Sequence, residues 1–316
     1  MDTRKPIVTL LIPCHNEEQS LPILYREVTA VLSSLSDYRF ELFFVDDGSM
    51  DGTLEILKSL KATDSRVSYV SLSRNFGKEN AMLAGMDRIE SDCVILMDAD
   101  LQDPPSLIPE MLRYWQQGYQ DVYARRISRG RESWLRRRLS LLFYKILASS
   151  TKFEMLQNVG DFRLLDRRCV DAVISMRETE RYTKGLFCWI GYKKKELLFN
   201  RGNRIAGSSK WSLWSLLNLA TEGITSFTTA PLRIASICGF FIAMMSFVFL
   251  LYYLIKTLVY GDPVQGFPTL VTIILFIGGI QLLCLGILGE YIGRIYNETK
   301  QRPPYLINES SRGTAS

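Results

Sequence analysis

The chain has 316 residues, of which 47% are hydrophobic and 22% charged, and its formal net charge is +5. It contains one histidine, which excludes a multi-histidine metal site and argues against Ser-His-Asp chemistry. The six cysteines show no C-x-x-C spacing, so they predict neither a zinc site nor disulfides and are typical of a reducing compartment. Charge is unevenly distributed, because residues 1–210 are rich in charged side chains whereas residues 234–289 carry almost none.

Residues 1–210 alternate short apolar runs with longer segments of helical periodicity. The predicted strands are residues 7–12, 41–45, 67–72, 93–97 and 121–124. The predicted helices are residues 21–35, 53–62 and 79–89. Strand–helix repeats at this spacing predict an α/β domain with a mainly parallel sheet and helices on its faces. Ligands of such sheets bind beyond the carboxyl ends of the strands.

Polar residues follow each of the first four predicted strands. These turns are Pro13-Cys14-His15-Asn16-Glu17-Glu18, Asp46-Asp47-Gly48-Ser49, Ser73-Arg74-Asn75-Phe76-Gly77-Lys78 and Asp98-Ala99-Asp100-Leu101-Gln102-Asp103-Pro104. Any one of them could be an ordinary strand-to-helix turn with a capping Asp or Asn. Four polar turns at one edge of a sheet instead predict a binding site.

Asp98 and Asp100 are two residues apart at the end of a predicted strand, so both carboxylates can point to one centre. Mg²⁺ and Mn²⁺ prefer oxygen ligands and commonly use one or two carboxylates together with substrate phosphates. Gln102 offers a neutral oxygen two residues further on. A D-x-D pair alone is a weak signal, but at this strand end it predicts a divalent metal site.

Two uncharged stretches, residues 234–255 and 267–289, follow the α/β part. About 20 apolar residues cross a bilayer core, so both predict transmembrane helices, at about 234–257 and 267–290. The alternative is a pair of buried helices in a soluble protein. Basic residues flank the pair, whereas the short loop between them carries few, which predicts a cytoplasmic head and a short external loop. Residues 296–316 are expected to be a cytoplasmic tail without a further ordered element.

Three of the polar turns that follow the predicted strands resemble the motifs of the family 2 inverting glycosyltransferases of the GT-A fold. They are Ile12-Pro13-x-His15-Asn16-Glu17-Glu18, Val45-Asp46-Asp47-Gly48-Ser49 and Asp98-x-Asp100. The resemblance implies a Rossmann-like nucleotide-diphospho-sugar transferase head, with Asp47 near the base or ribose and Mg²⁺ or Mn²⁺ at Asp98, Asp100 and Gln102. The other residues expected to bind the nucleotide sugar are Pro13, Asn16, Glu17, Asp46, Asn75, Lys78 and Ala99. His15 stands where the family more often has Tyr or Phe.

Three further segments narrow the resemblance to the polyisoprenyl-phosphate glycosyltransferases, and within them to the bactoprenol glucosyltransferases. They are residues 72–78 (LSRNFGK), 158–164 (NVGDFRL) and 288–294 (LGEYIGR). The resemblance runs from about residue 6 to residue 306. It implies transfer of a hexose to a polyprenyl phosphate, and relatives use mannose, N-acetylhexosamines or aminoarabinose.

Asp161, within the second of these segments, is the candidate catalytic carboxylate, and Arg163 lies beside it. Inverting transfer normally needs a base, but a phosphate monoester is already largely dianionic at neutral pH because its second pKa is about 6. Asp161 is therefore expected either to act as the base or to orient the acceptor or Arg163. The remaining alternative is a turn residue that precedes a strand.

Residues 125–138 contain seven arginines and one glutamate. Such a run is commonly a solvated basic face. Close to an anionic leaflet each cation adds about 1 kcal/mol of attraction, and the arginine fork suits phosphate oxygens. At least one of four arginines is therefore expected to bind the acceptor phosphate: Arg125, Arg126, Arg136 and Arg137. Nucleic acid is excluded as a partner, because the net charge is only +5 and no nucleic-acid motif accompanies the run.

The glycines and serines of residues 200–211 predict a flexible loop before the membrane part. Arg204 and Lys210 in this loop are expected either to close over the diphosphate or to anchor the chain at the membrane. Residues 211–232 have an amphipathic pattern with tryptophans, which predicts a helix in the membrane interface. A helix packed against the head is the alternative.

These features together predict inverting transfer of glucose from UDP-glucose to undecaprenyl phosphate at the cytoplasmic face of a bacterial inner membrane. Another donor (UDP-N-acetylhexosamine, a UDP-aminoarabinose type or GDP-mannose) stays open, as does a homo-oligomer. The product would serve cell-envelope modification, such as O-antigen or teichoic acid glycosylation, through a separate flippase and a downstream glycosyltransferase. A processive polysaccharide synthase is disfavoured because Q-x-x-R-W is absent, and a non-catalytic scaffold because Asp98, Asp100 and Asp161 are intact.

Overall fold

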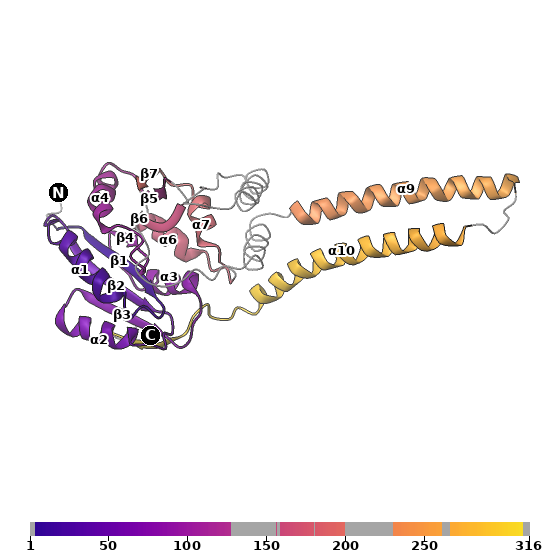
Figure 1. The fold of residues 1–316 in the computed structure, drawn as a ribbon. Coiled ribbons are helices and arrows are strands. Elements are labelled where there is room, and N and C mark those ends of the chain that lie inside the picture. The colour runs from indigo at the N-terminus through magenta and orange to yellow at the C-terminus, as the bar shows by residue number, and fades with distance from the viewer. Residues whose placement is uncertain are drawn as a thin grey trace.

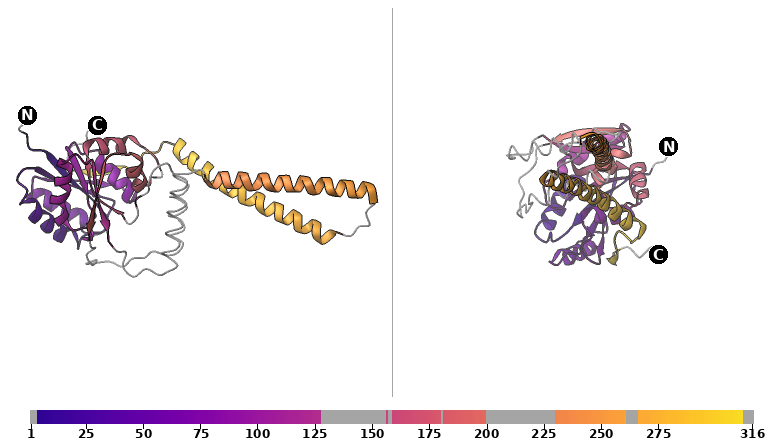
Figure 2. Two further views of the ribbon diagram at one scale, coloured as in Figure 1. Left: turned by 90° about the horizontal axis from the view of Figure 1, so that it is seen from above. Right: turned by 90° about the vertical axis from the view of Figure 1, so that its right-hand side faces the viewer.

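The computed structural model describes residues 4–127, 156, 159–179, 181–199, 230–260 and 266–311. These residues form an α/β head and two long helices that lie side by side and extend away from it (Figure 1). After the second long helix the chain returns to the head, so its two ends both lie there (Figure 2).

Within the described residues, eight strands form one sheet in the order β7-β5-β6-β4-β1-β2-β3-β8. Their bounds are β1 (Ile7–Cys14), β2 (Arg39–Asp46), β3 (Val67–Leu72), β4 (Cys93–Leu96), β5 (Asp121–Arg126), β6 (Val159–Asp166), β7 (Lys194–Phe199) and β8 (Ile307–Ser310). Strands β3, β2, β1 and β4 are parallel, which confirms the mostly parallel α/β sheet expected from the sequence. Strand β6 is antiparallel to both β4 and β5, and β8 is antiparallel to β3.

Helices cover both faces of the sheet. They are α1 (Leu21–Leu32), α2 (Thr53–Thr63), α3 (Lys78–Met86), η1 (Pro105–Leu107), α4 (Ile108–Gln116), α6 (Arg167–Ser175) and α7 (Thr183–Trp189). One apolar core lies between the sheet and α1, α2 and α4, and a second lies between the sheet and α3, α6 and α7. Strand β1 serves both cores, because Leu10 and Ile12 face the first and Leu11 faces the second.

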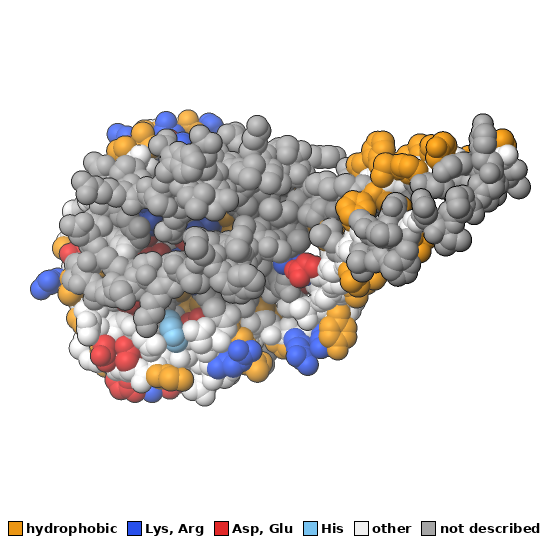
Figure 3. Space-filling model, turned by 45° about the vertical axis from the view of Figure 1, so that its right-hand side comes forward, with side chains coloured by type: hydrophobic (Ala, Val, Ile, Leu, Met, Phe, Trp, Pro, Cys, Tyr) orange, Lys and Arg blue, Asp and Glu red, His pale blue; other side chains and the backbone are white. Residues whose placement is uncertain are grey.

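The two long helices are α9 (Ala230–Tyr260) and α10 (Phe267–Thr299). They carry many exposed apolar side chains, such as Phe241, Leu282 and Ile292, and Figure 3 shows orange atoms along them. Of the described residues, one helical segment, Phe276–Thr299, is long and apolar enough to cross a membrane, and Gly239–Phe249 is a shorter apolar stretch. The expected stretches are therefore helical, and two membrane crossings stay a prediction.

The C-terminal residues differ from the tail expected at 296–316. Helix α10 continues to Thr299, and Ile307–Ser310 then forms β8 at the edge of the sheet, paired with β3. The expectation of no ordered element after the second apolar stretch is wrong. Four residues of mixed polarity give no strand pattern of their own, and their backbone hydrogen bonds to β3 make the strand.

Candidate active site

The antiparallel pairing of β6 with β4 brings Asp161 to the edge of the sheet at which Asp98 lies. Leu96 in β4 pairs with Arg163 in β6, so the two aspartates each stand two residues beyond this pair. Since Asp98 also follows the carboxyl end of a parallel strand, the site lies where ligands of α/β sheets bind. Asp161 lies inside β6, and its interpretation as a turn residue before a strand is wrong.

Lys78, the first residue of α3, joins these two carboxylates. Its Nζ lies 2.5 Å from Oδ2 of Asp161 and forms a second ion pair with Asp98. Burial alone would lower the pKa of Lys78, but Asp161 and Asp98 outweigh it and raise the pKa above its usual value. Lys78 therefore carries a permanent positive charge between the two aspartates.

Lys184 of α7 approaches Asp161 from the other oxygen, with its Nζ 4.0 Å from Oδ1. This buried Oδ1 accepts no hydrogen bond from the described residues. Burial would raise the pKa of Asp161, but Lys78 and Lys184 outweigh it and lower the pKa to about 2. A carboxyl group with this pKa is a weak base at neutral pH, so the geometry favours Asp161 as the group that holds two lysines in place.

The loop after β4 collects the oxygens expected to hold a metal ion. Gln102 is 4% exposed, and its Oε1 accepts no hydrogen bond within the described part of the chain. Oδ1 of Asp100 accepts a hydrogen bond from the Gln102 backbone N–H at 3.2 Å. Among the described residues, no three His, Cys, Asp or Glu side chains are grouped to hold a metal by themselves. Asp98, Asp100 and Gln102 stay the predicted ligands of a Mg²⁺ or Mn²⁺, which would complete its coordination with substrate phosphates and water.

Asp103 adds a further carboxylate to the same loop. It is buried, and its Oδ2 accepts from the backbone N–H of Asp98 at 3.5 Å. Burial, with repulsion from Asp98, raises the pKa of Asp103 to about 7, although Arg126 and Lys78 act in the opposite direction. The loop thus concentrates negative charge that a bound cation would neutralise.

Asp46 and Asp47 lie beneath the surface of the site. Asp46 accepts hydrogen bonds from the Ser71 hydroxyl at 2.7 Å and from the Ser49 backbone N–H at 3.1 Å. The two carboxylate oxygens of Asp47 accept from the backbone N–H groups of Phe76 and Gly77 at 2.7 and 3.0 Å. Both aspartates are buried, so they shape the turns around the expected uridine site from below.

His15 connects three of the polar turns at the surface of the head, where the single histidine is pale blue in Figure 3. Its Nδ1 lies 2.9 Å from the carbonyl oxygen of Asp47, so in the neutral ring Nδ1–H donates and Nε2 accepts. Nε2 accepts from the side-chain amides of Asn75 at 3.0 Å and Asn16 at 3.2 Å. The Oδ1 atom of each side-chain amide accepts a hydrogen bond from a backbone N–H, which fixes the orientation of the two amide groups.

The remaining predicted residues of the first and fourth turns support these groups. Pro13 is half-buried at the end of β1, and Ala99 is buried between the two aspartates of the D-x-D segment. The backbone N–H of Glu17 donates to Thr53 Oγ1 at 2.8 Å, and its carboxylate accepts from the Ser20 hydroxyl. Glu17 therefore ties the first turn to the start of α2.

Gly48 allows the second and third turns to approach each other. Its φ is +64°, and a Cβ atom there would lie 2.4 Å from the carbonyl carbon of Arg74 and 2.6 Å from the backbone nitrogen of Asn75. Any larger residue would have to displace the backbone of the third turn, which carries Asn75 and Lys78.

Arg163 is placed differently from the catalytic role expected for it. It is 1% exposed, its Nη1 lies 3.2 Å from Oδ2 of the buried Asp121, and its guanidinium stacks 4.0 Å from the centre of the Phe187 ring. A side chain so enclosed cannot touch a substrate. Arg163 instead joins β6 to β5 and adds a smaller positive contribution that lowers the pKa of Asp161.

The two described arginines of the basic run point in different directions, because successive strand residues face opposite sides of a sheet. Arg125 Nη1 lies 2.9 Å from Oε2 of Glu196 in β7. The positive charge of Arg126 lowers the pKa of Asp103. The buried Nε of Arg126 donates no hydrogen bond to the described residues. Arg126 is therefore the one of this pair that faces the candidate site. Arg136, Arg137, Arg204 and Lys210, with the basic run, the loop and the amphipathic segment, lie outside the described residues.

Sequence reasoning missed Lys184 and Asp103. Lys184 follows Thr183 at the start of a short helix with no pattern of its own, and only the tertiary fold brings it to Asp161. Asp103 stands in the predicted fourth turn, and the three aspartates within residues 98–103 were a usable signal.

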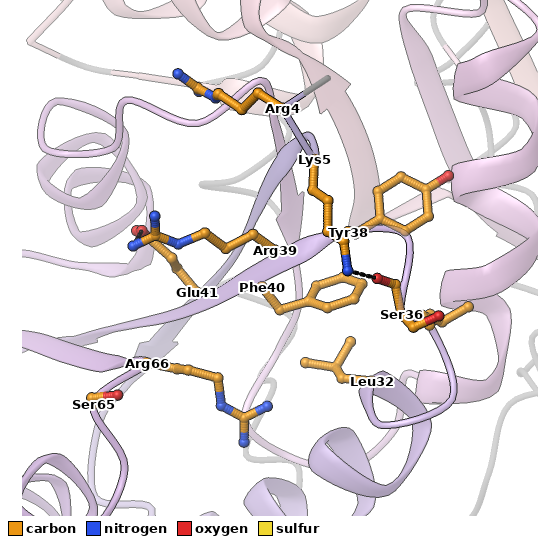
Figure 4. A pocket seen from close by; sticks show the side chains of 11 residues that line it. Arg4, Lys5, Leu32, Ser36, Tyr38, Arg39, Phe40, Glu41, Ser65 and Arg66 are labelled. Carbon is orange, nitrogen blue, oxygen red and sulfur yellow. Dashed lines mark hydrogen bonds and ion pairs between the residues drawn. The ribbon is translucent and has the colours of Figure 1, made fainter. Parts of the chain in front are cut away.

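A hollow of about 600 Å³ lies at the other end of the parallel strands, and Figure 4 shows the side chains that line it. Each of its four cations contacts a group of the protein: Lys5 donates to the Ser36 carbonyl, Arg66 pairs with Asp64, Arg4 pairs with Asp92 and Arg39 pairs with Glu41. Because the hollow lies at the end of the sheet opposite the polar turns, the candidate site is the carboxyl edge of the sheet.

Carboxylates paired with lysine side chains suit a diphosphate that binds a metal and departs with negative charge, which is the chemistry of GT-A-type glycosyltransferases. The comparison with known proteins agrees. Residues 9–174 match the family model of Glycosyl transferase family 2, and residues 230–295 match that of the GtrB C-terminal hairpin. The chain belongs to glycosyl transferase family 2 and is a glycosyltransferase.

Two curated relatives match this chain over nearly its full length. The chain is 43% identical to the SfII prophage-derived bactoprenol glucosyl transferase of Shigella flexneri, covering 97% of this chain and 99% of that protein. It is 42% identical to the putative glycosyltransferase CsbB of Bacillus subtilis, covering 98% of this chain and 93% of that protein. A glucosyl-3-phosphoglycerate synthase from Mycobacterium tuberculosis, solved with Mn²⁺ and UDP, is 20% identical with a TM-score of 0.41, covering 68% of this chain and 76% of that one.

Proposed function

We propose that the protein transfers glucose from UDP-glucose to undecaprenyl phosphate at the cytoplasmic face of a bacterial inner membrane, with inversion at the anomeric carbon. The observation that carries this proposal is the Asp98–Lys78–Asp161 series, in which Lys78 holds a positive charge between the loop that we propose to bind a metal ion and the buried carboxylate of Asp161. The relatives named bactoprenol glucosyl transferases, similar over nearly their full length, support the lipid acceptor and the glucose.

In the proposed reaction an oxygen of the lipid phosphate attacks the anomeric carbon, and the bond from that carbon to the UDP oxygen breaks. UDP keeps the electron pair, and an α-linked donor gives a β-linked lipid phosphosugar. The phosphate monoester is largely dianionic at neutral pH, since its second pKa is about 6, so it needs no base. Asp161, with its pKa of about 2, is suited to orient Lys78 and Lys184 rather than to take a proton.

Asp98, Asp100 and Gln102 are the residues that we propose to hold Mg²⁺ or Mn²⁺ in the working enzyme. The bound ion would supply neutralisation of the departing diphosphate. Gln102 fits this role because its buried Oε1 otherwise lacks a partner among the described residues. Lys78 would add charge from the protein side.

Helices α9 and α10 are proposed to cross the membrane as a pair and to hold the head at the height of the lipid phosphate. Their length and exposed apolar side chains support this, as does the match to the C-terminal hairpin family. The product would then need a separate flippase and a downstream glycosyltransferase, because a two-helix anchor offers no translocation path.

The test is a donor panel. Membranes that contain the protein are incubated with undecaprenyl phosphate and labelled UDP-glucose, UDP-N-acetylglucosamine, UDP-aminoarabinose or GDP-mannose. We expect a labelled lipid from UDP-glucose alone. A labelled lipid from another donor alone would change the sugar but keep the class of reaction. No labelled lipid from any donor, with no stabilisation of the purified protein by UDP in a thermal melt, would favour a non-catalytic scaffold.

A further inference from the structure

The C-terminal residues 298–311, here called the strap, lead from the end of α10 back to the edge of the sheet. Near its start, Oε2 of Glu298 accepts a hydrogen bond from the Thr179 backbone N–H at 2.9 Å. At its end, β8 pairs with β3, and the Ser311 hydroxyl accepts from the Tyr69 backbone N–H at 2.7 Å. The strap therefore joins the long helices to the head through several separate contacts.

Tyr305 of the strap holds the end of α3. Its hydroxyl donates to Oδ2 of Asp87 at 2.6 Å and accepts from Nη1 of Arg88 at 3.0 Å. The Arg88 guanidinium also lies 5.5 Å from the centre of the Tyr305 ring. Asp87 is held from the other side by Arg177, at 2.7 and 2.8 Å. The residues that follow α3 are thus fixed between the strap and the segment after α6.

Leu306, the next residue of the strap, holds the beginning of the third polar turn. Its carbonyl oxygen accepts from the backbone N–H of Ser73 at 2.9 Å, directly after β3. Glu309 reinforces this pairing, because it accepts from the Tyr69 hydroxyl at 2.6 Å and pairs with Lys58 at 2.9 Å. These two contacts lower the pKa of Glu309, so it stays ionised at neutral pH.

Two adjacent strap residues, Tyr305 and Leu306, therefore form hydrogen bonds with the two ends of residues 73–88. Between these two contacts lie Asn75, which donates a hydrogen bond to His15, and Lys78, which pairs with both Asp98 and Asp161. We propose that the strap is a positioning element of the donor site, which sets where Asn75 and Lys78 stand and so couples the membrane helices to nucleotide binding. This inference rests on the proposed function only for the identity of the nucleotide.

The test uses the full chain in detergent, with Tyr305→Phe and a second variant in which Tyr305→Phe is combined with Glu309→Gln. We expect the affinity for UDP, measured by calorimetry in the presence of Mn²⁺, to fall by about fivefold or more, which is the scale of one lost hydrogen bond. The KM for the donor should rise in parallel, whereas the KM for the lipid acceptor and the melting temperature stay near the wild-type values. Hydrogen exchange should become faster at residues 73–88 as well as at residues 303–311.

Tyr192→Phe is the matched control, because Tyr192 packs on the same core cluster as Tyr305 but lies outside the strap. Faster exchange of the strap with unchanged UDP affinity and unchanged exchange at residues 73–88 would overturn the proposal. If neither variant releases the strap, a chain that ends at Pro303 is measured in the same way and judged by the same two readouts. If the wild-type protein does not bind UDP, the proposed function is wrong. The hydrogen exchange at residues 73–88 then tests the proposed role of the strap by itself.

Discussion

The ammonium nitrogen of Lys78 lies 2.5 Å from Oδ2 of Asp161, a residue 83 positions further along the chain. Lys78 also pairs with Asp98, so one lysine connects the loop that we propose to hold the metal with the buried carboxylate of β6. This connection determines how each of these groups acts in the proposed transfer.

Lys78→Met should lower kcat by about 100-fold or more, because a fixed charge beside a leaving diphosphate acts mainly in the transition state. Lys78→Arg keeps the charge and should recover part of the loss. The measurement is steady-state formation of labelled lipid by the purified protein. Lys193→Met, which changes an exposed lysine outside the site, serves as the control. Equal activity of Lys78→Met and the control would remove Lys78 from the mechanism.

Asp161→Asn should lose most transferase activity but keep the acid limb of the pH profile at the wild-type pH. The folded pKa of Asp161 is about 2, below its usual 3.8. Its contribution to stability is therefore present above its usual pKa and is lost only as the pH falls towards 2. Between pH 5 and 8 Asp161 does not titrate. Activity should fall with falling pH because the lipid phosphate gains a proton near its second pKa of about 6 and Asp103 gains one near its pKa of about 7. An acid limb that disappears in Asp161→Asn would show that Asp161 is the titrating base.

Lys184→Ala should raise the KM for undecaprenyl phosphate by about tenfold and leave the KM for the nucleotide sugar nearly unchanged. The reason is that Lys184 faces Oδ1 of Asp161, whereas Lys78, which also pairs with Asp98, faces Oδ2. Lys184→Arg should retain most of the acceptor affinity. Lys193→Ala is again the control. A rise in the donor KM alone would place Lys184 on the nucleotide side.

Gly48→Ala should weaken UDP binding and destabilise the head by about 1–3 kcal/mol, because the new Cβ collides with the backbone of Arg74 and Asn75. Gly118→Ala separates this collision from backbone strain, since Gly118 also has a positive φ of +84° but nothing within 4 Å of a Cβ. Thermal melts with and without UDP measure both effects. Equal loss in the two variants would show that the close approach of the turns does not matter.

Much of the head follows from local sequence patterns. Strand β3 has the bounds expected from its apolar run, and the polar turns after β1 to β4 meet at one edge because those strands are parallel. Helix α1 ends at Leu32 rather than at residue 35. Ser33 is its C-cap, and the next two backbone N–H groups, of Ser34 and Leu35, donate to Val31 and Leu32 in tighter turns.

The parts that could not be predicted depend on pairing between distant segments. The antiparallel register of β6 with β4 moves Asp161 towards Asp98, and no local pattern specifies that register. The burial of Arg163 against Asp121, and the addition of β8 to the sheet, likewise arise only from tertiary contacts.

One measurement tests the central proposal most directly: purified full-length protein, with Mg²⁺ or Mn²⁺, is given labelled UDP-glucose and undecaprenyl phosphate, and the lipid product is counted beside Lys78→Met. We expect the wild-type protein to form labelled undecaprenyl phosphate glucose and release UDP in equal amounts, and the variant to form about one hundredth as much or less. UDP release without labelled lipid, or equal lipid formation by both proteins, would contradict a transfer carried out at the Asp98–Lys78–Asp161 site.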